Sequence, residues 1–332
     1  MELIPGLPND IGRQCLTCLP YSNFPKFFEV SKRWKMEIES DHFHRQRKCS
    51  SSSQALVLLT QSNPDFKLVI YEPESSSWNT IPTIPGYPDG LPPFSQCVGV
   101  GRKLVVIGSW EPTTWKSTNS VYVFDFMSGK WKRRADMPGP ARLFFGCASD
   151  GNRMVFVAGG HDDDNIALSS AMAYDVIKDE WIALPDMPKH LDECKAIFNR
   201  SQFHVIGGYR RDDTEKLEMH VVKYDTITGK WCQMDDDLLH KGMCSRNCVA
   251  DKEGRLFRCS AGCVAVFDGF KWADITKLPV DGKIFVIGSD KFGGIQSIYM
   301  CEFSRGKCSA WTKMDAPQAF TGKVQARCWL EM

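Results

Sequence analysis

Short hydrophobic runs, separated by polar turn residues, recur through most of this chain. Residues 144–184 show the pattern most clearly, with apolar runs at 144–148, 154–158, 171–175 and 180–184. Gly151 and the pair Gly159-Gly160 interrupt these runs, and Pro185 follows the last one. Runs of this length, bounded by Gly, Pro, Asp and Asn, predict four β-strands that form one antiparallel sheet.

One phrase repeats at a regular spacing: an aromatic residue, usually an acid, a short turn and then a tryptophan. The tryptophans of successive copies are Trp78, Trp131, Trp181, Trp231, Trp272 and Trp311, at intervals of 53, 50, 50, 41 and 39 residues. A period of about 40–50 residues indicates one supersecondary unit repeated along the chain. Because a four-stranded sheet cannot cover its own faces, we expect the units to pack side by side and to close into a ring that protects the sheet edges.

Two kinds of residue in this phrase have expected structural roles. The tryptophans are predicted to pack between neighbouring units, because an indole ring offers a large apolar surface with one polar group. Asp125, Asp175 and Asp225 follow the aromatic residue directly, and we expect each carboxylate to accept hydrogen bonds from backbone N–H groups of the next turn.

The repeat resembles that of the kelch β-propellers, which share the hydrophobic run, the double glycine, the aromatic-Asp pair and the spaced tryptophan. The resemblance implies a mainly β fold, a kelch-type β-propeller with about six four-stranded blades over residues 54–332. The C-terminal run 323–329 follows the sixth tryptophan as innermost strands follow the others, so we expect it to pair into the first blade and close the ring. Only residues 279–282 precede the run 283–287, so the sixth blade is expected to be three-stranded or distorted at its inner edge.

The first 48 residues have a helical period instead. Apolar residues follow Pro8 at helical spacing up to Leu19, with Asn9 or Asp10 as the expected N-cap, and two further amphipathic stretches begin at Ser22 and before Trp34. Three short helices make a marginal domain, which usually gains stability by docking its apolar face on a partner. The serines within residues 49–53 predict a short flexible joint to the repeats.

This N-terminal segment resembles an F-box through Leu7-Pro8, Asp10-Ile11, Cys15-Leu16, Leu19-Pro20, Val30-Ser31-Lys32 and Trp34, although the family's usual basic residue before the second proline is missing. The resemblance implies binding to a Skp-type adaptor, and through it to a cullin and a RING protein. The residues implied to enter the apolar groove of the adaptor are Leu7, Pro8, Ile11, Leu16, Leu19, Val30 and Trp34. The alternative is a helical cap that packs on the propeller and has no other role.

An F-box directly before kelch repeats is the arrangement of a family of plant proteins. The chain resembles the members that recruit phenylalanine ammonia-lyase or type-B response regulators of cytokinin signalling. The resemblance implies a substrate-recognition subunit of an SCF (Skp-cullin-F-box) ubiquitin ligase, whose propeller recruits a target for ubiquitination and proteasomal degradation. The alternative is a kelch scaffold that tethers partners without ubiquitination, and binding of the adaptor distinguishes the two.

The long irregular loops of the repeats are expected on one face of the propeller, and short glycine turns on the other. Binding residues concentrate on loops held by a rigid scaffold, and Trp, Tyr and Arg dominate protein–protein contacts. We therefore predict substrate contacts at Trp110, Trp115, Arg142, His161, Tyr209 and Arg210. The acidic run Asp162–Asp164 is expected to be a solvated loop, and His161 has the alternative of a hydrogen bond within its own turn.

Fourteen cysteines raise the question of disulfides or metal sites. Five of them fall in the predicted innermost strands, which favours a repeated packing role for a small apolar residue: Cys97, Cys147, Cys194, Cys248 and Cys328. Cys15 and Cys18 have zinc-like spacing but no second pair at the spacing of a zinc site, so we expect no metal. We expect reduced thiols and a location in the cytoplasm, the nucleus or both, because no signal segment or membrane span is apparent.

Composition excludes several classes of function. A net charge of +1 gives no general attraction to nucleic acid or to membranes. The seven histidines show no paired metal-ligand spacing, which a copper oxidase on this fold would need. No Gly-x-Ser-x-Gly motif of a hydrolase is present. We therefore expect a non-catalytic protein without a cofactor.

Overall fold

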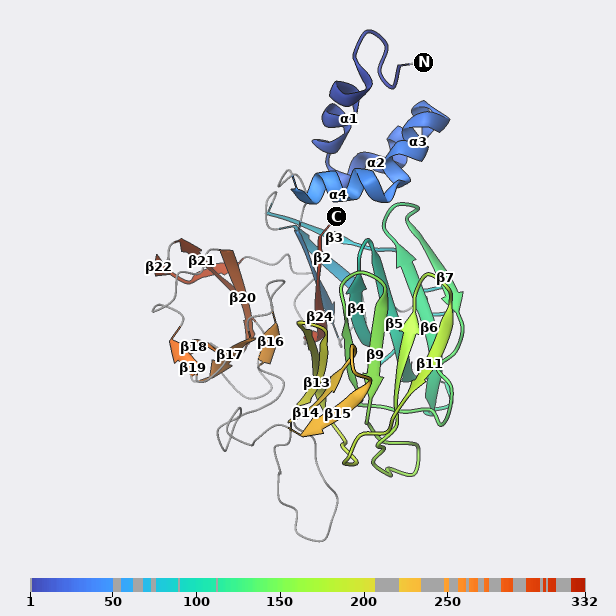
Figure 1. Ribbon diagram of the computed structural model, residues 1–332, viewed down its shortest axis with the longest axis vertical. Coiled ribbons are helices and arrows are strands. Elements are labelled where there is room, and N and C mark those ends of the chain that lie inside the picture. The colour runs from blue at the N-terminus through green and yellow to red at the C-terminus, as the bar shows by residue number, and fades with distance from the viewer. Residues whose placement is uncertain are drawn as a thin grey trace.

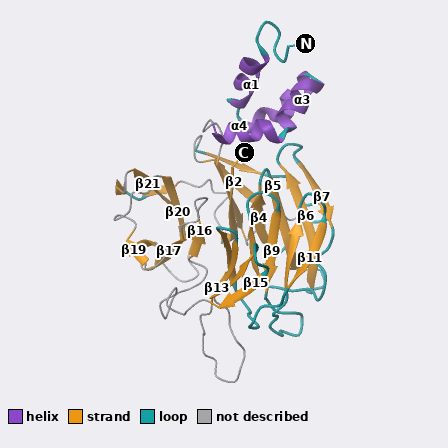
Figure 2. Ribbon diagram, viewed as in Figure 1, coloured by secondary structure: helices purple, strands orange, loops and turns teal. Residues whose placement is uncertain are grey.

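The computed structural model describes residues 2–49, 55–61, 68–72, 76–88, 90–111, 113–206, 221–233, 248–250, 256–260, 263–267, 272–274, 282–288, 297–304, 307–308, 310–314 and 324–331. Its helices lie in the N-terminal segment, and the strands follow them in the chain (Figure 2). The strands of the described residues form six antiparallel sheets, each built largely from one copy of the sequence repeat.

The first three sheets contain these strands in spatial order. The first sheet consists of β24 (Val324–Glu331), β1 (Ala55–Gln61), β2 (Leu68–Glu72) and β3 (Ser77–Thr80). The second consists of β4 (Gln96–Val100), β5 (Lys103–Trp110), β6 (Ser117–Asp125) and β7 (Lys130–Arg134). The third consists of β8 (Gly146–Ser149), β9 (Met154–Ala158), β10 (Ala171–Asp175) and β11 (Glu180–Leu184).

The last three sheets continue the series. The fourth consists of β12 (Lys195–Asn199), β13 (Gln202–Ile206), β14 (Val221–Asp225) and β15 (Lys230–Gln233). The fifth consists of β16 (Cys248–Ala250), β17 (Leu256–Ser260), β18 (Cys263–Phe267) and β19 (Trp272–Asp274). The sixth consists of β20 (Gly282–Gly288), β21 (Ser297–Ser304), β22 (Lys307–Cys308) and β23 (Thr312–Met314).

The C-terminal strand β24 pairs antiparallel with β1, with Val57 opposite Trp329, as the sequence predicted. In the sixth sheet, β22 and β23 both pair with β21 at different points along it, and β20 pairs with β21 as well. Within the part of the chain that the structure describes, this sheet therefore has three strand positions, in agreement with the short segment before residue 283.

Neighbouring sheets share hydrophobic clusters, because their strands bury side chains on both faces. Separate clusters join the first sheet to the second, the second to the third and the third to the fourth. The inner strands β24, β4, β8, β12 and β16 contact one another in that order, which adds the fifth sheet to the series. The rings of Tyr71 in β2 and Phe285 in β20 lie 5.9 Å apart, so the sixth sheet packs on the first.

The tryptophans of the repeat hold successive sheets together. The indole N–H of Trp131 donates to the carbonyl of Pro82 at 2.6 Å, that of Trp181 to Ala135 at 3.0 Å and that of Trp231 to Pro185 at 2.6 Å. Each acceptor lies just after the last strand of the preceding sheet. The same geometry recurs at three successive junctions, which confirms the predicted packing role for these three tryptophans and explains their constant position in the repeat. Trp311 of the sixth unit differs, because it is 38% exposed.

The aspartates after the aromatic residue also have their predicted role. Asp125 accepts from the N–H of Met127, Asp175 from those of Ile177 and Lys178, and Asp225 from those of Ile227 and Thr228. These bonds fix the turn between the third and fourth strands. Arg153 also pairs with Asp175, and its hydrogen bonds lower the pKa of that carboxyl to about 2.

The helical segment contains α1 (Asn9–Thr17), the 3-10 turn η1 (Tyr21–Asn23), α2 (Phe24–Val30), α3 (Lys32–Glu39) and α4 (Asp41–Cys49). The structure corrects the prediction of three helices, because α4 is a separate fourth helix. Pro8 rather than Asn9 or Asp10 is the N-cap of α1. The side chain of Asn9 instead accepts a hydrogen bond from the N–H of Leu3 at 2.6 Å.

The inner cysteines largely follow the prediction. Cys97 in β4 and Cys147 in β8 are buried, Cys328 lies in β24, and Cys194 is buried directly before β12 rather than within it. Burial raises the pKa of the Cys147 thiol to about 12, as expected for a packing residue. Cys301 in β21 is disulfide-bonded, so the expectation of reduced thiols fails at this position.

Candidate functional site

The four helices enclose a small core of large apolar side chains. Leu16, Phe24, Ile38 and Phe43 are buried together with Met127, which comes from the turn after β6. Leu19 and Trp34 pack against this core, and the indole N–H of Trp34 donates to the carbonyl of Leu3 at 2.7 Å. Leu16 therefore stabilises the helices from inside.

A buried arginine fastens α4 to the end of α1. The guanidinium of Arg47 donates to the carbonyls of Thr17 and Leu19 at 2.6 and 2.5 Å, and it lies 5.1 Å from the centre of the Phe24 ring. These carbonyls have no helical partner at the end of α1, so a cation is favourable there. Sequence reasoning missed Arg47, because a basic residue near a helix end usually lies in solvent.

The outer side of the same helices exposes apolar side chains. Ile11 is 42% exposed, Val30 is 59% exposed and Met36 is 73% exposed. Of the other residues implied to bind an adaptor, Pro8 is exposed, and Leu7, Leu19 and Trp34 are partly buried. Met36 in α3 was not among the predicted contacts. The exposed set Pro8, Ile11, Val30 and Met36 is called the apolar helix set below.

The helices are attached to the sheets by specific contacts. Tyr21 donates a 2.7 Å hydrogen bond to Glu72 Oε1 in β2, and its ring lies edge-on to Phe126 at 6.4 Å. Arg102 donates to the carbonyl of Glu39 at 3.0 Å. In Figure 1, α4 lies between the other helices and the ends of the strands, at one end of the sheets. The helical segment is thus held against the first two sheets.

A row of aromatic rings lies at the other end of the sheets, on loops and, for Trp110, on the last residue of β5. Ring centroids are separated by 5.8 Å between Trp115 and Trp110, 4.8 Å between Trp110 and Phe94, 5.1 Å between Phe94 and Phe144, and 5.5 Å between Phe144 and His161. We call these five residues the aromatic row. It crosses from the second sheet to the third, and Trp115 is 68% exposed.

The backbone holds two members of this row in an uncommon conformation. Phe94 and Phe144 have φ of +61° and +52°, and each lies two residues before the innermost strand of its sheet. Glu193, two residues before β12, has φ of +47° in the equivalent position. Positive φ is strained for a bulky residue, and such strain is concentrated at functional sites.

Strand β6 connects the two ends. It begins at Ser117, beside Trp115, and ends at Asp125, directly before Phe126 and Met127 of the helix contact. Nine residues in extended conformation span about 30 Å. The apolar helix set and the aromatic row are therefore separated by the length of one buried strand.

The chain is similar in sequence to known proteins along its whole length. The Kelch motif family matches residues 94–138 and 141–188, which contain all strands of the second and third sheets. The Arabidopsis thaliana F-box/kelch-repeat protein At1g80440 is 38% identical over the full length of both chains. The chain belongs to the F-box/kelch-repeat family. A second F-box/kelch-repeat protein of Arabidopsis thaliana, At1g15670, is 36% identical over the full length of both chains. F-box/kelch-repeat protein SKIP20 of the same plant is 29% identical over 71% of this chain and 67% of its own.

Within the kelch sheets, Arg142 has a different place from the predicted one. Its side chain is 0% exposed and donates to the carbonyls of Gly159 and Ser170 at 3.2 Å and to the Ser170 hydroxyl at 2.9 Å. Burial lowers its pKa to about 10. Arg142, in the loop before β8, therefore holds the loop 159–170 in place. The carbonyl of Gly159, the first residue of the double glycine, faces its guanidinium.

The double glycine itself is required by space. Gly160 has φ of +82°, and a Cβ at this position would overlap the carbonyl oxygen of Leu143. This close approach allows Leu143 and His161 to exchange two backbone hydrogen bonds of 2.9 and 3.1 Å. The glycines thus bring His161 up against Phe144.

The polar residues beside the aromatic row are also fixed. His161 Nδ1 lies 2.7 Å from Asp192 Oδ1 of the next loop, so His161 pairs between loops and not within its own turn. Asp163 accepts from the N–H of Ser117 at 3.1 Å and from its hydroxyl at 2.5 Å, and so joins the second sheet to the third. Asp162 accepts from two N–H groups of its own loop. Tyr209 and Arg210 lie outside the described residues.

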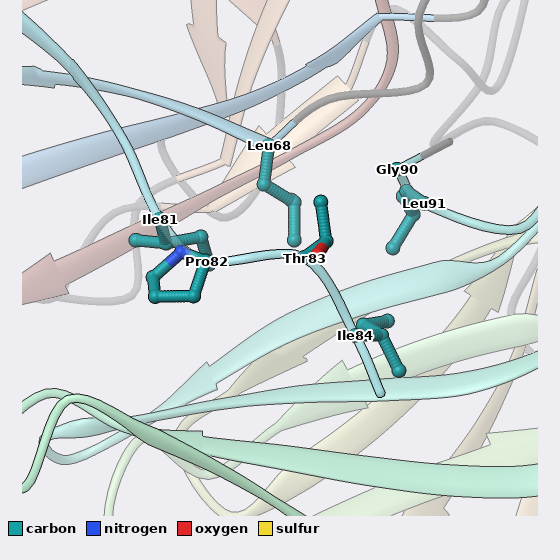
Figure 3. Close-up of a pocket in the computed structure, with 7 residues that line it drawn as sticks. All are labelled: Leu68, Ile81, Pro82, Thr83, Ile84, Gly90 and Leu91. Carbon is teal, nitrogen blue, oxygen red and sulfur yellow. The ribbon is translucent and has the colours of Figure 1, made fainter. Parts of the chain in front are cut away.

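A small apolar cavity lies between the first two sheets (Figure 3). It is lined by Leu68, Ile81, Pro82, Thr83, Ile84, Gly90 and Leu91, and its volume is about 10 Å³. That volume accommodates about one water molecule, so this cavity is not a ligand site. In the described part of the chain, no group of three His, Cys, Asp or Glu side chains is arranged to hold a metal ion. None of the described helices combines the length and the apolar character needed to cross a membrane.

Proposed function

We propose that this protein is a substrate-recognition subunit of an SCF (Skp-cullin-F-box) ubiquitin ligase. The observation that carries the proposal is the rigid attachment of the helices, with apolar residues such as Ile11 and Val30 exposed, to sheets whose far end presents the aromatic row. Apolar side chains exposed on a small helical segment fit helix-in-groove binding to a partner. The names of the full-length relatives, F-box/kelch-repeat proteins, support the same function.

The proposed mechanism involves no chemistry by this chain. The apolar helix set enters the groove of a Skp-type adaptor, which joins a cullin and a RING protein with a charged ubiquitin-conjugating enzyme. Leu16 and Arg47 keep the helices in the shape that presents this set. The kelch sheets, closed into a propeller, hold the target at the opposite end. Ubiquitin transfer is accelerated because target lysines are kept near the ubiquitin donor at high effective concentration.

Targets are proposed from the resemblance of the sequence to one group of plant proteins. Phenylalanine ammonia-lyase and type-B response regulators are the first candidates, so the protein would control phenylpropanoid synthesis or cytokinin signalling. Both the cytoplasm and the nucleus are proposed locations. The target is the candidate that is degraded when the F-box is intact and stays stable when the F-box is changed.

The experiment is co-purification from plant cells treated with a proteasome inhibitor. Tagged full-length protein is compared with a Pro8→Ala/Ile11→Ala/Val30→Ala variant, which changes only exposed residues. The control is a Lys26→Ala variant, because Lys26 is also an exposed residue of these helices and lies in α2. We expect wild type and the control to retain adaptor and cullin, and the triple variant to lose them but keep its propeller-bound proteins. If wild type retains neither ligase subunit, the kelch scaffold without ligase activity becomes the better account.

A further inference from the structure

The loops that carry the aromatic row are strongly acidic. Segments 111–116, 135–145, 159–170 and 185–194 contain eight carboxylates and three basic side chains, one of which, Arg142, is buried. The carboxylates belong to Glu111, Asp136, Asp162, Asp163, Asp164, Asp186, Asp192 and Glu193, and the other basic residues are Lys116 and Lys189. Of these carboxylates, Asp136 is already paired with Arg133 at the end of β7. The charge of this surface contrasts with the near-neutral chain as a whole, so its acidity is local.

Several of these carboxylates are held in place before any partner arrives. Glu111 accepts from the Tyr87 hydroxyl at 3.0 Å, Asp163 is bound by Ser117, and Asp192 is paired with His161. The hydrogen bonds from Ser117 lower the pKa of Asp163, which keeps it ionised. Groups fixed in this way cost little entropy on binding, so they act as a preorganised acidic frame around the rings.

The rings between these acids are available to a partner. Trp115 is 68% exposed, and a turn in which Trp115 N–H donates to the carbonyl of Glu111 at 2.8 Å holds it out from the sheet. Trp110, Phe94, Phe144 and His161 are each partly exposed. The face of an indole ring attracts cations, and the attraction grows when carboxylates lie nearby.

We propose that the aromatic row binds a segment of the target protein that carries arginine or lysine side chains. This inference rests on the proposed function, because it assigns the target to this end of the propeller. The cationic group lies over the Trp115 ring, its aliphatic stem covers the neighbouring rings, and the surrounding carboxylates pair with further basic residues. Acidic and phosphorylated segments are repelled by the same carboxylates.

The test uses full-length protein co-expressed with a Skp-type adaptor. A phage-displayed library of random 12-residue peptides is selected on wild type, on Trp115→Leu and on Ile177→Ala. Leucine keeps an apolar side chain but removes the ring. Ile177 is the matched control, because it is 66% exposed in a turn at the helix end of the third sheet. We expect peptides that bind wild type and Ile177→Ala but not Trp115→Leu to be enriched in arginine or lysine.

The affinity of a recovered peptide, made synthetically, is then measured for wild type and for the variants. Replacing its basic residue by glutamine, or Trp115 by leucine, is expected to weaken binding about 5- to 30-fold, the range of a well-formed cation–π contact. Asp164→Asn, which removes one exposed charge, and a higher salt concentration should each weaken binding about 2- to 5-fold.

Three results would overturn the inference. They are enrichment of acidic or uncharged apolar peptides, equal recovery on Trp115→Leu, and recovery of no peptide that depends on Trp115. The same preparations report adaptor binding. If wild type binds the adaptor while one of these results is found, the inference alone fails. If wild type does not bind the adaptor, the proposed function fails.

Discussion

Tyr21 of the helical segment donates a 2.7 Å hydrogen bond to Glu72 Oε1 of strand β2, and the acceptor is buried. This bond, together with the edge-on contact between Tyr21 and Phe126, makes the helices part of the same body as the first two sheets. Burial and the Glu72 hydrogen bond both raise the pKa of Tyr21, so the phenol stays protonated and donates throughout the neutral range.

Tyr21→Phe removes the hydroxyl and keeps the ring. We expect the helices to lose about 1–3 kcal/mol of stability against the sheets, because a buried carboxylate loses one of its donors. Hydrogen exchange of the α1–α4 amides measures this loss directly. Tyr299→Phe, on a partly exposed tyrosine of β21, should change nothing in the helices. Equal exchange in the two variants would show that the Tyr21 bond does not hold the helices.

Arg142→Met tests the bracing role of the buried arginine. The carbonyls of Gly159 and Ser170 would lose their donor, and we expect unfolding to be easier by about 2–4 kcal/mol. Arg133→Met is the control, since Arg133 pairs with Asp136 in solvent and should cost less than about 1 kcal/mol. Chemical denaturation compares the two. A stable Arg142→Met protein that only lost target binding would contradict the bracing role.

Gly160→Ala separates steric overlap from backbone strain. Gly151 has a similar φ of +77°, but a Cβ there meets no atom within 4 Å. Gly151→Ala should therefore cost about 1–2 kcal/mol for the left-handed backbone alone. Gly160→Ala adds overlap with Leu143. We therefore expect it to lower the free energy of unfolding, measured by thermal denaturation, by at least about 2 kcal/mol more than Gly151→Ala does. Similar losses in the two variants would show that the loop beside His161 moves aside.

His204 makes stability depend on pH. Burial, and to a smaller extent the charge of Lys223, lowers the pKa of this β13 histidine to about 4. The unfolded chain protonates it below about pH 6.5, whereas the folded chain keeps it neutral. Stability is therefore full above pH 6.5 and falls as the pH drops from 6.5 to 4. Denaturation curves of wild type and His204→Leu across this range should show a smaller fall in the variant. Parallel curves would contradict the assignment.

The repeat made most of the fold predictable. The strand runs, the C-terminal pairing and the short sixth unit follow from local pattern, and the constant position of Trp131, Trp181 and Trp231 reflects one hydrogen bond repeated between sheets. Helix α4 was missed because its sequence is mostly polar. Its main anchors are Phe43 and the buried Arg47, and a buried arginine leaves no hydrophobic signal.

The candidate surfaces were less predictable, for two physical reasons. Leu16 and Ile11 are both apolar residues of α1. Their helical spacing does not decide which one faces the internal core and which one faces solvent. In the loops, Phe94 and Phe144 resemble the start of a buried strand, and only their positive φ brings them into the aromatic row. Arg142 resembled an exposed contact because its acceptors lie in a different loop, 159–170, which is distant from it in sequence.

The central claim is that the exposed side of the helices binds a Skp-type adaptor. The direct measurement is calorimetric titration of purified full-length protein with purified adaptor, for wild type, Ile11→Glu and Ile177→Glu, both changed at exposed isoleucines. We predict tight binding by wild type and Ile177→Glu, and a loss of at least about 100-fold for Ile11→Glu, because a charge would be buried in an apolar groove. Unchanged binding by Ile11→Glu, or no binding by wild type, would contradict the account.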